Sequence, residues 1–376
     1  MHSSDTRQEK ESERLLREVF SKFSAGGTFL KGYPYGSGHI HDTFLVETAE
    51  SGCDNYILQK LNNRIFKDIP SLQENIERVT VHLREKLRKT EGSDVKRECL
   101  TLVPALDGKT WISDRQGNFW RMYIFITNHR SYDIVDSAGK AFQGGKAIGR
   151  FQAMLADLGG EPLHETIPFF HNVEKRLEAF QLACGSDPER RLKDCGPETE
   201  DILSRAEKMK IILRLGDEGK IPLRITHNDT KFNNILLDEN DNALCVIDLD
   251  TVMPGYVHYD FGDAIRTAAN TAAEDETDLS KVDLNIGLYE AYAMGYLGET
   301  RNTLNDTEKE WLAFAPQLIT YIIGLRFLTD HIDGDHYFKI HRENHNLHRA
   351  RAQMQLVKSM EKQYGEMRKI AQGLKG

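Results

Sequence analysis

Hydrophobic and polar positions divide the chain into a strand-rich first third and a mainly helical remainder. Alternating apolar residues are typical of half-buried strands, whereas apolar residues three and four positions apart indicate a helix with one buried face. The first third is predicted to contain a helix over 11–23, strands within 29–46 and over 56–61, a helix from 70, and strands over 95–103 and 118–126. Two strands, a helix and two further strands predict a small antiparallel sheet.

Beyond about residue 127, helical spacing dominates. The predicted helices cover residues 140–158, 173–182, 199–218, 284–297 and 307–332. One segment, 223–252, differs because short apolar runs alternate there with turn residues. The pattern predicts an α+β chain in three parts: an N-terminal leader and helix (1–24), a small lobe with a β-sheet and a helix (25–127), and a helical lobe (128–376).

The irregular segment also carries the sharpest chemical signal. A polar loop between two short apolar runs contains Asp229, Lys231 and Asn234, and the next apolar run ends in Asp248, followed by Asp250. Phosphoryl transfer to a hydroxyl needs a carboxylate that takes the hydroxyl's proton and oxygen ligands that hold Mg²⁺ on the triphosphate. An aspartate five residues before an asparagine, with another aspartate on the next strand, matches a known kinase signature.

On this hypothesis Asp229 is the catalytic base, Asn234 and Asp248 bind Mg²⁺, and Lys231 lies where the transferring phosphoryl group accumulates negative charge. His227, two residues before the base, would hold the loop by hydrogen bonding. Asparagine and aspartate also favour turns for backbone reasons alone, so the loop by itself is equally compatible with an ordinary turn. The acidic end of the apolar run favours the catalytic interpretation, because buried carboxylates cost desolvation unless a cation is bound.

A glycine-rich stretch near the start would serve the nucleotide. Gly36 and Gly38 would let backbone amides approach phosphates, although a glycine-rich hairpin is more often only a tight turn. Lys60 lies on the next predicted strand, where a kinase fold places the lysine that contacts the α- and β-phosphates. The following helix would supply the glutamate that pairs with this lysine, and Glu74 is slightly preferred over Glu77.

In this order the glycine loop, lysine, helix glutamate and acidic loop resemble the aminoglycoside phosphotransferase and choline kinase superfamily. More specific motifs resemble the N-acetylhexosamine 1-kinases, at residues 38–44, 227–231, 246–255, 325–330 and 334–338. The similarity extends from about Gly32 to Met360 and implies a bilobal, protein-kinase-like fold. His41 departs from the family pattern, which has asparagine at this position.

The resemblance implies an ATP- and Mg²⁺-dependent phosphotransferase that acts on the anomeric C1 hydroxyl of N-acetylglucosamine or N-acetylgalactosamine. The predicted base would engage this hydroxyl, and Asp250 would add a contact at the metal site. Arg326, Tyr337 and His39 resemble sugar-pocket residues, since a guanidinium can bind two ring hydroxyls and an aromatic ring can stack on a pyranose. Arg326 is equally compatible with a helix-terminal cation, and His39 with an ordinary loop histidine. Asp260 would support the catalytic loop by hydrogen bonds.

The composition and net charge of the chain limit the kinds of molecule that it is expected to bind. The chain has 376 residues, 39% hydrophobic and 28% charged, which suits a two-lobed globular protein. A formal net charge of −9 argues against a nucleic-acid surface. The most apolar run falls short of the roughly 20 residues of a membrane span, and the cysteines lack paired spacing. We expect a cytoplasmic protein whose partners are ATP and a small sugar, with neither nucleic acid nor membrane, and no oligomeric state is predicted.

Two alternatives remain open on the sequence. The acceptor could be another small alcohol, such as an aminoglycoside, choline or homoserine, although amine substrates usually call for an acidic or aromatic pocket and Arg326 favours a neutral sugar. The chain could also be a pseudokinase that binds nucleotide without transferring phosphate, against which the intact Asp229, Asn234 and Asp248 argue. A third alternative, a hydrolase such as a desulfatase acting on mucin sugars, would need the C/S-x-P-x-R site that is converted to formylglycine, and none of the five cysteines begins one.

Two further patterns look functional and are interpreted otherwise. Residues 139–146 resemble a phosphate-binding loop, but Gly145 occupies the lysine position and no Ser or Thr completes the pattern. His341, His345 and His348 are spaced like one face of a helix. Because arginines surround them and no acidic cluster is adjacent, we interpret them as a solvated basic face rather than a metal site.

Overall fold

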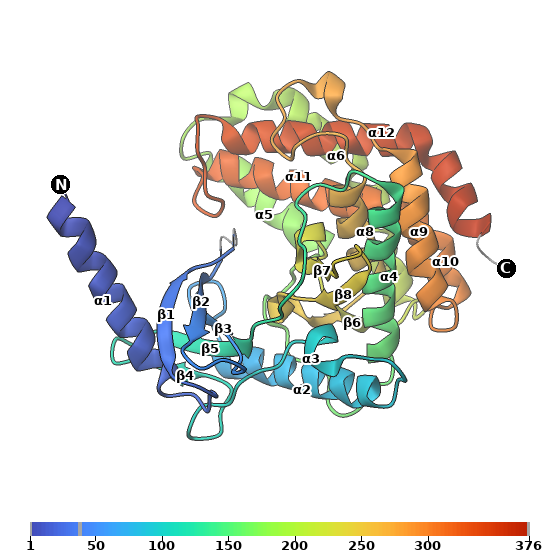
Figure 1. Cartoon of the computed structure of the whole chain (residues 1–376). Helices are drawn as coiled ribbons and strands as arrows, with labels where there is room; N and C mark the ends of the chain where they lie inside the picture. Colours follow the sequence, from blue (N-terminus) through green and yellow to red (C-terminus); the bar gives the residue numbers. More distant parts are fainter. Residues whose placement is uncertain (1, 37–39, 374–376) are drawn as a thin grey trace. The chain divides into compact units, whose positions relative to one another are not determined.

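The computed structural model describes residues 2–36 and 40–373, which form two compact units (Figure 1). The units comprise Met1–His129 with His164–Ile167 (unit 1), and Arg130–Leu163 with Pro168–Gly376 (unit 2). Unit 1 holds an antiparallel sheet, and unit 2 is mainly helical. The α+β fold predicted from the sequence is therefore confirmed.

Unit 1 is built on a five-stranded sheet with the strand order β1-β2-β3-β5-β4. Its elements are α1 (His2–Phe20), β1 (Phe29–Pro34), β2 (Asp42–Thr48), β3 (Tyr56–Leu61), α2 (Ile69–Arg88), α3 (Val95–Glu98), β4 (Ile112–Ser113) and β5 (Phe119–Ile124). One face of the sheet packs on α1, and this core contains Leu16, Val19 and Phe20 of the helix with Tyr56, Leu58, Trp120 and Met122 of the strands. Alternation along each strand sends the intervening side chains to the opposite face.

The strand predicted over 95–103 is wrong in its first half. Asp94 caps a short helix there, because its Oδ1 accepts the N–H of Lys96 at 3.1 Å while Glu98 Oε1 accepts the N–H of Asp94 at 2.7 Å. These local bonds outweigh the strand pattern. The rest of the segment is extended and follows β5, with the N–H of Val103 donating to the carbonyl of Met122 at 2.8 Å. The short strand β4 lies between the predicted strands and was not itself predicted.

Unit 2 contains helices around two short hairpin-like sheets, β6-β9 and β7-β8. Its elements are α4 (Ala138–Leu155), α5 (Val173–Ser186), η1 (Leu192–Asp194), α6 (Gly196–Met209), α7 (Ile211–Asp217), β6 (Arg224–Thr226), η2 (Phe232–Asn234), β7 (Ile235–Leu237), β8 (Ala243–Val246), η3 (Leu249–Thr251), β9 (Met253–Gly255), α8 (Val257–Ala268), η4 (Leu279–Lys281), α9 (Ile286–Thr300), α10 (Asp306–Trp311), η5 (Leu312–Phe314), α11 (Ala315–Asp333) and α12 (His345–Gly373). The five predicted helices are present, two of them divided by a break. Helices α8 and α12 were not predicted.

Helix α11 is the central helix of unit 2 and is buried along most of its length. Together with α10 and η5 it forms a stretch, Asp306–Asp333, that is long and apolar enough to cross a membrane by length and composition. However, 89% of its most apolar window is buried inside the structure, as in the core helix of a globular unit. Burial on all sides also explains why its sequence lacks a clear polar face.

The glycines of residues 139–146 serve helix packing. A Cβ atom on Gly145 of α4 would lie 2.0 Å from the carbonyl oxygen of Tyr292 on α9, and one on Gly295 of α9 would lie 2.1 Å from that of Phe142. Gly149 makes a similar approach to Tyr296, at 2.7 Å. Helices α4 and α9 therefore touch backbone to backbone, and the resemblance to a phosphate loop is coincidental.

This contact predicts that Gly145→Ala destabilises unit 2. The added methyl group meets backbone atoms that cannot rotate away, so we expect a loss of about 3 kcal/mol in the free energy of unfolding. Gly139→Ala, in the same helix but with no atom within 4 Å of its Cβ, is the matched control and should be neutral or slightly stabilising. Urea denaturation of both variants measures the difference. Equal stability of the two would contradict the packing account.

Candidate active site

The predicted catalytic residues lie on two adjacent loops of unit 2. The first, here called the catalytic loop, comprises residues 227–234 between β6 and β7 and ends in η2. The second, the acidic turn, comprises residues 248–251 directly after β8. Strands β7 and β8 pair antiparallel, with Ile235 opposite Val246, which places the end of one loop beside the start of the other. The predicted hairpin is thus present.

Asp229 is the centre of the polar contacts in the catalytic loop. Lys231 Nζ lies 3.1 Å from Asp229 Oδ2. Asn234 Nδ2 donates to the backbone carbonyl of Asp229 at 2.8 Å and lies 3.4 Å from its Oδ2. The amide oxygen of Asn234 is thereby oriented away from this contact and has no hydrogen-bond donor among the described residues. The three predicted residues are therefore gathered around one carboxylate.

The catalytic loop is anchored by the carboxylate of Asp260 on α8, which is fully buried. Asp260 Oδ2 accepts the N–H of His227 at 2.9 Å, and Oδ1 accepts the N–H of Asn228 at 2.7 Å. Gln152 Nε2 of α4 donates to the same carboxylate at 2.6 Å, and Thr230 Oγ1 donates to the Asp260 carbonyl at 2.6 Å. Burial raises the pKa of Asp260 above its ordinary value, although these donors counteract the shift.

His227 joins the catalytic loop to the acidic turn. Its Nε2 donates to the carbonyl of Ile247 at 2.8 Å, and its Nδ1 accepts the N–H of Asp229 at 3.3 Å. From the turn, Thr251 Oγ1 donates to the His227 carbonyl at 2.6 Å. Asp229 and the acidic turn are consequently linked through the buried His227.

Both loops contain a residue in the left-handed region, which non-glycine residues rarely adopt. Asn228 has a φ of 66°, and Asp248 has a φ of 60°. Asn228 is held there by donating to the carbonyls of Thr226 and Thr251 at 3.2 and 2.9 Å. Such strain is characteristic of functional loops, where the surrounding structure fixes the backbone.

The carboxylates of the acidic turn repel one another. Burial, the adjacent Asp250 and the nearby Asp229 raise the pKa of Asp248 to about 7, and Lys231 only partly offsets this. A divalent cation would relieve the repulsion, and carboxylate and amide oxygens are ligands that Mg²⁺ accepts. No cluster of three or more His, Cys, Asp or Glu able to hold a metal occurs among the described residues. A kinase site needs only Asn234 and Asp248, because phosphate oxygens complete the coordination.

A second cluster is centred on Arg326 of α11. Its guanidinium carbon lies 5.2 Å from the ring centre of Phe170, 5.4 Å from that of Tyr337 and 5.3 Å from that of Phe338. Asp330 positions two of these rings, because its carboxylate accepts the N–H groups of Tyr337 and Phe338 at 2.7 and 2.9 Å. The predicted pair of Arg326 and Tyr337 is thus brought together.

His171 connects this aromatic cluster to the catalytic loop. It follows Phe170 in the chain, and its Nε2 donates to the carbonyl of Asn228, next to Asp229, at 2.8 Å. Burial lowers the pKa of His171 to about 4, so the ring is neutral at physiological pH. Its buried Nδ1 has no partner among the described residues.

The structure describes only some of the residues of unit 1 that are predicted to bind the nucleotide. Gly36 is a turn glycine with a φ of 78°, whereas Gly38 and His39 lie outside the described residues. Glu74 is exposed and pairs with His164, with 3.1 Å between Oε2 and Nε2. Within the described residues no ion pair joins Lys60 to Glu74 or Glu77, and the Lys60–Glu74 pair stays a prediction.

The register of β3 and β5 indicates a second candidate for a cation that contacts phosphates in this sheet. Lys60 is opposite Trp120 and so lies on the face that packs on α1. Gln59 and Arg121 are opposite each other on the other face, where Arg121 is 1% exposed and its Nε donates to Gln59 Oε1 at 2.9 Å. Sequence reasoning missed Arg121 because its strand appeared to be an ordinary apolar one.

His41, which stands where the N-acetylhexosamine 1-kinase pattern has asparagine, has a structural role. Its Nδ1 accepts the N–H of Asn62 at 3.0 Å, and Asn62 Nδ2 donates to the carbonyl of Ile40 at 3.2 Å. These bonds tie the glycine-rich segment to the end of β3. An asparagine side chain carries an acceptor of the same kind, so the substitution keeps this link possible.

The histidines interpreted as a solvated face require correction. Only His345 and His348 lie on α12, and His345 is 2% exposed, with its Nε2 3.0 Å from Asp275 Oδ2. Its Nδ1 accepts the N–H of His341 at 3.2 Å. The interpretation failed because it assumed one continuous helix, whereas α12 begins at His345.

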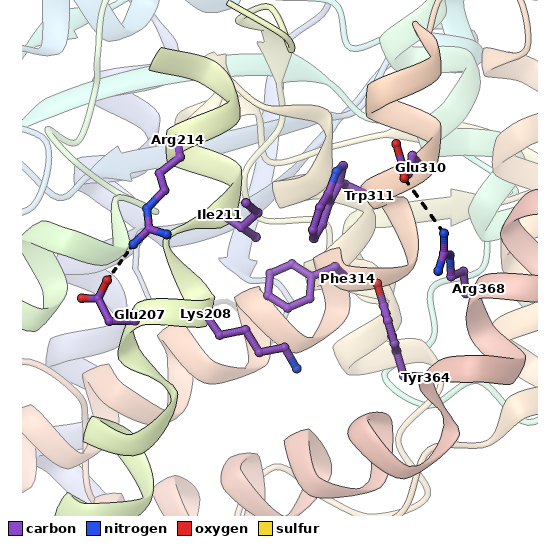
Figure 2. Close-up of a pocket in the computed structure, with 9 residues that line it drawn as sticks. All are labelled: Glu207, Lys208, Ile211, Arg214, Glu310, Trp311, Phe314, Tyr364 and Arg368. Carbon is purple, nitrogen blue, oxygen red and sulfur yellow. Dashed lines mark hydrogen bonds and ion pairs between the residues drawn. The ribbon is translucent and has the colours of Figure 1, made fainter. Parts of the chain in front are cut away.

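A separate pocket of about 430 Å³ lies between α6, α7, α10, η5 and α12 (Figure 2). Trp311, Phe314 and Tyr364 form its aromatic part, and the charged residues around it include Glu310 paired with Arg368. None of its lining residues belongs to the predicted site. Its ion pairs already satisfy most of its charged groups.

A model of the phosphotransferase enzyme family matches residues 32–301. The chain belongs to this family. The structure resembles an aminoglycoside phosphotransferase from Alicyclobacillus acidocaldarius, with a TM-score of 0.60 and 10% identity over 95% of this chain and 96% of that one. It also resembles an amicoumacin kinase solved with AMP-PNP and Ca²⁺ (TM-score 0.59, 12% identity, 96% of each chain). A Plasmodium vivax ethanolamine kinase is similar too (TM-score 0.53, 14% identity, 86% of this chain and 81% of that one).

The sequence analysis did not predict the residues that connect the cluster around Asp229 with the cluster around Arg326. His171 is far along the chain from the catalytic loop, and nothing in its spacing indicates contact with it. Asp330 lies in one of the motifs that resemble the sugar kinases, yet its role depends on a turn after α11, where Gly334 takes a φ of 106°. The available signal was an aspartate four residues before a glycine at a helix end, followed by Tyr337 and Phe338.

The buried His171 predicts acid sensitivity. Its ordinary pKa of 6.5 applies to the unfolded chain and falls to about 4 in the folded protein, so the unfolded chain binds the extra proton between these values. Stability should therefore fall as pH decreases from 6.5 to 4, by on the order of 3 kcal/mol from this residue. His171→Gln keeps a donor near the Nε2 position and should show a shallower loss in urea denaturation across this range. An unchanged slope would contradict the assignment.

Proposed function

We propose that the protein is an ATP- and Mg²⁺-dependent kinase that phosphorylates the anomeric C1 hydroxyl of N-acetylhexosamines. The observation that carries this proposal is the direct link between the two clusters of unit 2. His171 bonds to the backbone beside Asp229, and its neighbour Phe170 packs on Arg326. A base and a cation suited to sugar oxygens are thereby held in one rigid arrangement.

Asp229 acts as the base in this proposal. It accepts the proton of the C1 hydroxyl as the hydroxyl oxygen forms a bond to the γ-phosphorus and the bond to the β–γ bridging oxygen breaks, which releases ADP. Lys231 Nζ, 3.1 Å from Asp229 Oδ2, adds positive charge near the transferring group. The adjacent Asp229 carboxylate, helped by Asp263 and Asp248, raises the pKa of Lys231, so it stays protonated.

Asn234 and Asp248 would hold Mg²⁺, and Asp250 would support the same site. The bound cation would neutralise charge on the β- and γ-phosphates. The fit rests on the free amide oxygen of Asn234 and on the raised pKa of Asp248, whose ionised form needs a counter-charge. The solved amicoumacin kinase complex contains AMP-PNP and Ca²⁺, which agrees with a nucleotide and a divalent cation in this fold.

The sugar would be bound by Arg326 and Tyr337, with His39 as a further contact. The guanidinium of Arg326 makes no hydrogen bond or ion pair within the described residues, so its donors remain available to hydroxyl or acetamido oxygens. Tyr337 is 56% exposed and can stack on a pyranose face. We propose Gly36 and Gly38 for the nucleotide, and the strand register favours Arg121 as the phosphate contact over the predicted pair of Lys60 and Glu74.

The catalytic assignment predicts that Asp229→Asn lowers kcat for N-acetylglucosamine by about 10²- to 10⁴-fold, because the amide cannot take the proton. The KM of the sugar should change little. Asp107→Asn, on an exposed turn of unit 1, is the matched control and should keep normal kcat. ADP release with ATP, Mg²⁺ and the sugar measures both. Full turnover by the Asp229 variant would refute the role of Asp229.

The same assay across acceptors tests the substrate class. N-acetylglucosamine or N-acetylgalactosamine should be the best acceptor among free sugars, choline, ethanolamine, homoserine and an aminoglycoside. Turnover only with an amino alcohol or aminoglycoside would keep the kinase and reject the sugar. Nucleotide binding without turnover of any acceptor would instead indicate a pseudokinase.

The nucleotide contact is tested by a pair of variants. Because the register directs Lys60 to the α1 face, we expect Arg121→Lys to raise the KM for ATP about tenfold, since one ammonium group replaces the guanidinium fork. Lys60→Met should then change the KM less than threefold, which is within ordinary surface effects. The reverse outcome would assign the phosphate contact to Lys60. Thermal melting of both variants checks that the sheet remains folded.

A further inference from the structure

Arg326 has a second guanidinium close to it. Arg176 of α5 donates from Nε and Nη2 to the carbonyl of Phe170 at 3.1 and 2.8 Å. Phe170 is one of the rings around Arg326. One guanidinium therefore bonds to the backbone of Phe170 while the other packs on its ring, and the charge of Arg326 acts on Arg176.

No carboxylate neutralises this pair. Within the described residues neither Arg176 nor Arg326 forms an ion pair. Asp330, one turn beyond Arg326 on α11, is occupied by the N–H groups of Tyr337 and Phe338. The buried Asp263, near His171, is bonded to Arg266 at 2.8 Å.

Arg176 remains charged at neutral pH. Burial and the adjacent Arg326 lower the pKa of Arg176 to about 10, which still leaves it protonated. Two partly buried like charges without a counter-ion are costly. The cost is compensated when a ligand rich in oxygen acceptors is bound and is increased when the ligand is a cation.

Building on the proposed sugar kinase, we propose that Arg176 and Arg326 form a positive wall that rejects acceptors carrying an ammonium group. Arg176 is thereby a specificity-determining residue that acts through its charge. The pair favours a neutral sugar with an acetamido or hydroxyl group and disfavours the corresponding amino sugar. A member of a family that includes kinases of amines would in this way be restricted to neutral acceptors.

Three acceptors separate charge from other contacts: glucose, N-acetylglucosamine and glucosamine. The measured quantity is the ratio of kcat/KM for glucosamine to that for glucose at one neutral pH, in the full-length protein with saturating ATP and Mg²⁺. Removal of one charge from the wall in Arg176→Met should raise this ratio about tenfold. The ratio for N-acetylglucosamine to glucose should change much less, because both sugars are neutral.

Arg176→Lys distinguishes charge from positioning. Lysine keeps the charge but loses the two-point contact with the Phe170 carbonyl. If charge decides specificity, this variant retains the low glucosamine ratio of the wild type. If Arg176 only positions Phe170, the Lys and Met variants shift all three sugars alike, and the proposal is wrong.

The remaining outcomes also test the proposed positive wall. Turnover of neutral sugars with an unchanged glucosamine ratio in Arg176→Met overturns the positive wall and leaves the proposed function intact. Efficient turnover of ethanolamine, choline or an aminoglycoside by the wild type overturns the wall together with the sugar assignment. Should Arg176→Met be unstable, Arg176→Gln gives the same neutralisation with a polar side chain, and a low ratio in it contradicts the proposal.

Discussion

The buried carboxylate of Asp260 is the interaction on which the candidate site depends. It accepts two successive backbone N–H groups of the catalytic loop, from His227 and Asn228, and a third donor from Gln152. These bonds fix the strained backbone of Asn228 immediately before Asp229. Burial raises the pKa of Asp260 even with these donors in place, so the loss of any donor would make the buried charge more costly still.

The helix packing of unit 2 is coupled to this carboxylate. Tyr296 of α9 donates through its hydroxyl to Gln152 of α4, and Gln152 donates to Asp260 of α8. Gly149 allows α4 to approach Tyr296 at backbone distance. The glycines of α4 thus support the catalytic loop indirectly. They allow the close packing of the helices whose side chains bond to the loop.

Local signals predicted much of this arrangement. The alternation and helical spacing identified most strands and helices, and the spacing from Asp229 to Asn234 located the loop, because these features depend on near neighbours in sequence. Arg176, His171 and Arg121 could not be found in this way. Their positions follow from tertiary contacts between distant segments and from the register of β3 and β5. In the fold, α11 was predicted although burial on all sides removes its amphipathic pattern, whereas α8 and α12 were not predicted.

The proposed function combines the catalytic loop with the cationic, aromatic cluster, and the acceptor is inferred from the cluster. The position of phosphorylation decides whether this inference is right, and ³¹P NMR of the product formed from N-acetylglucosamine, ATP and Mg²⁺ measures it. We expect a phosphorus signal coupled to the anomeric proton. A signal coupled to any other sugar proton, or no sugar phosphate, would contradict it.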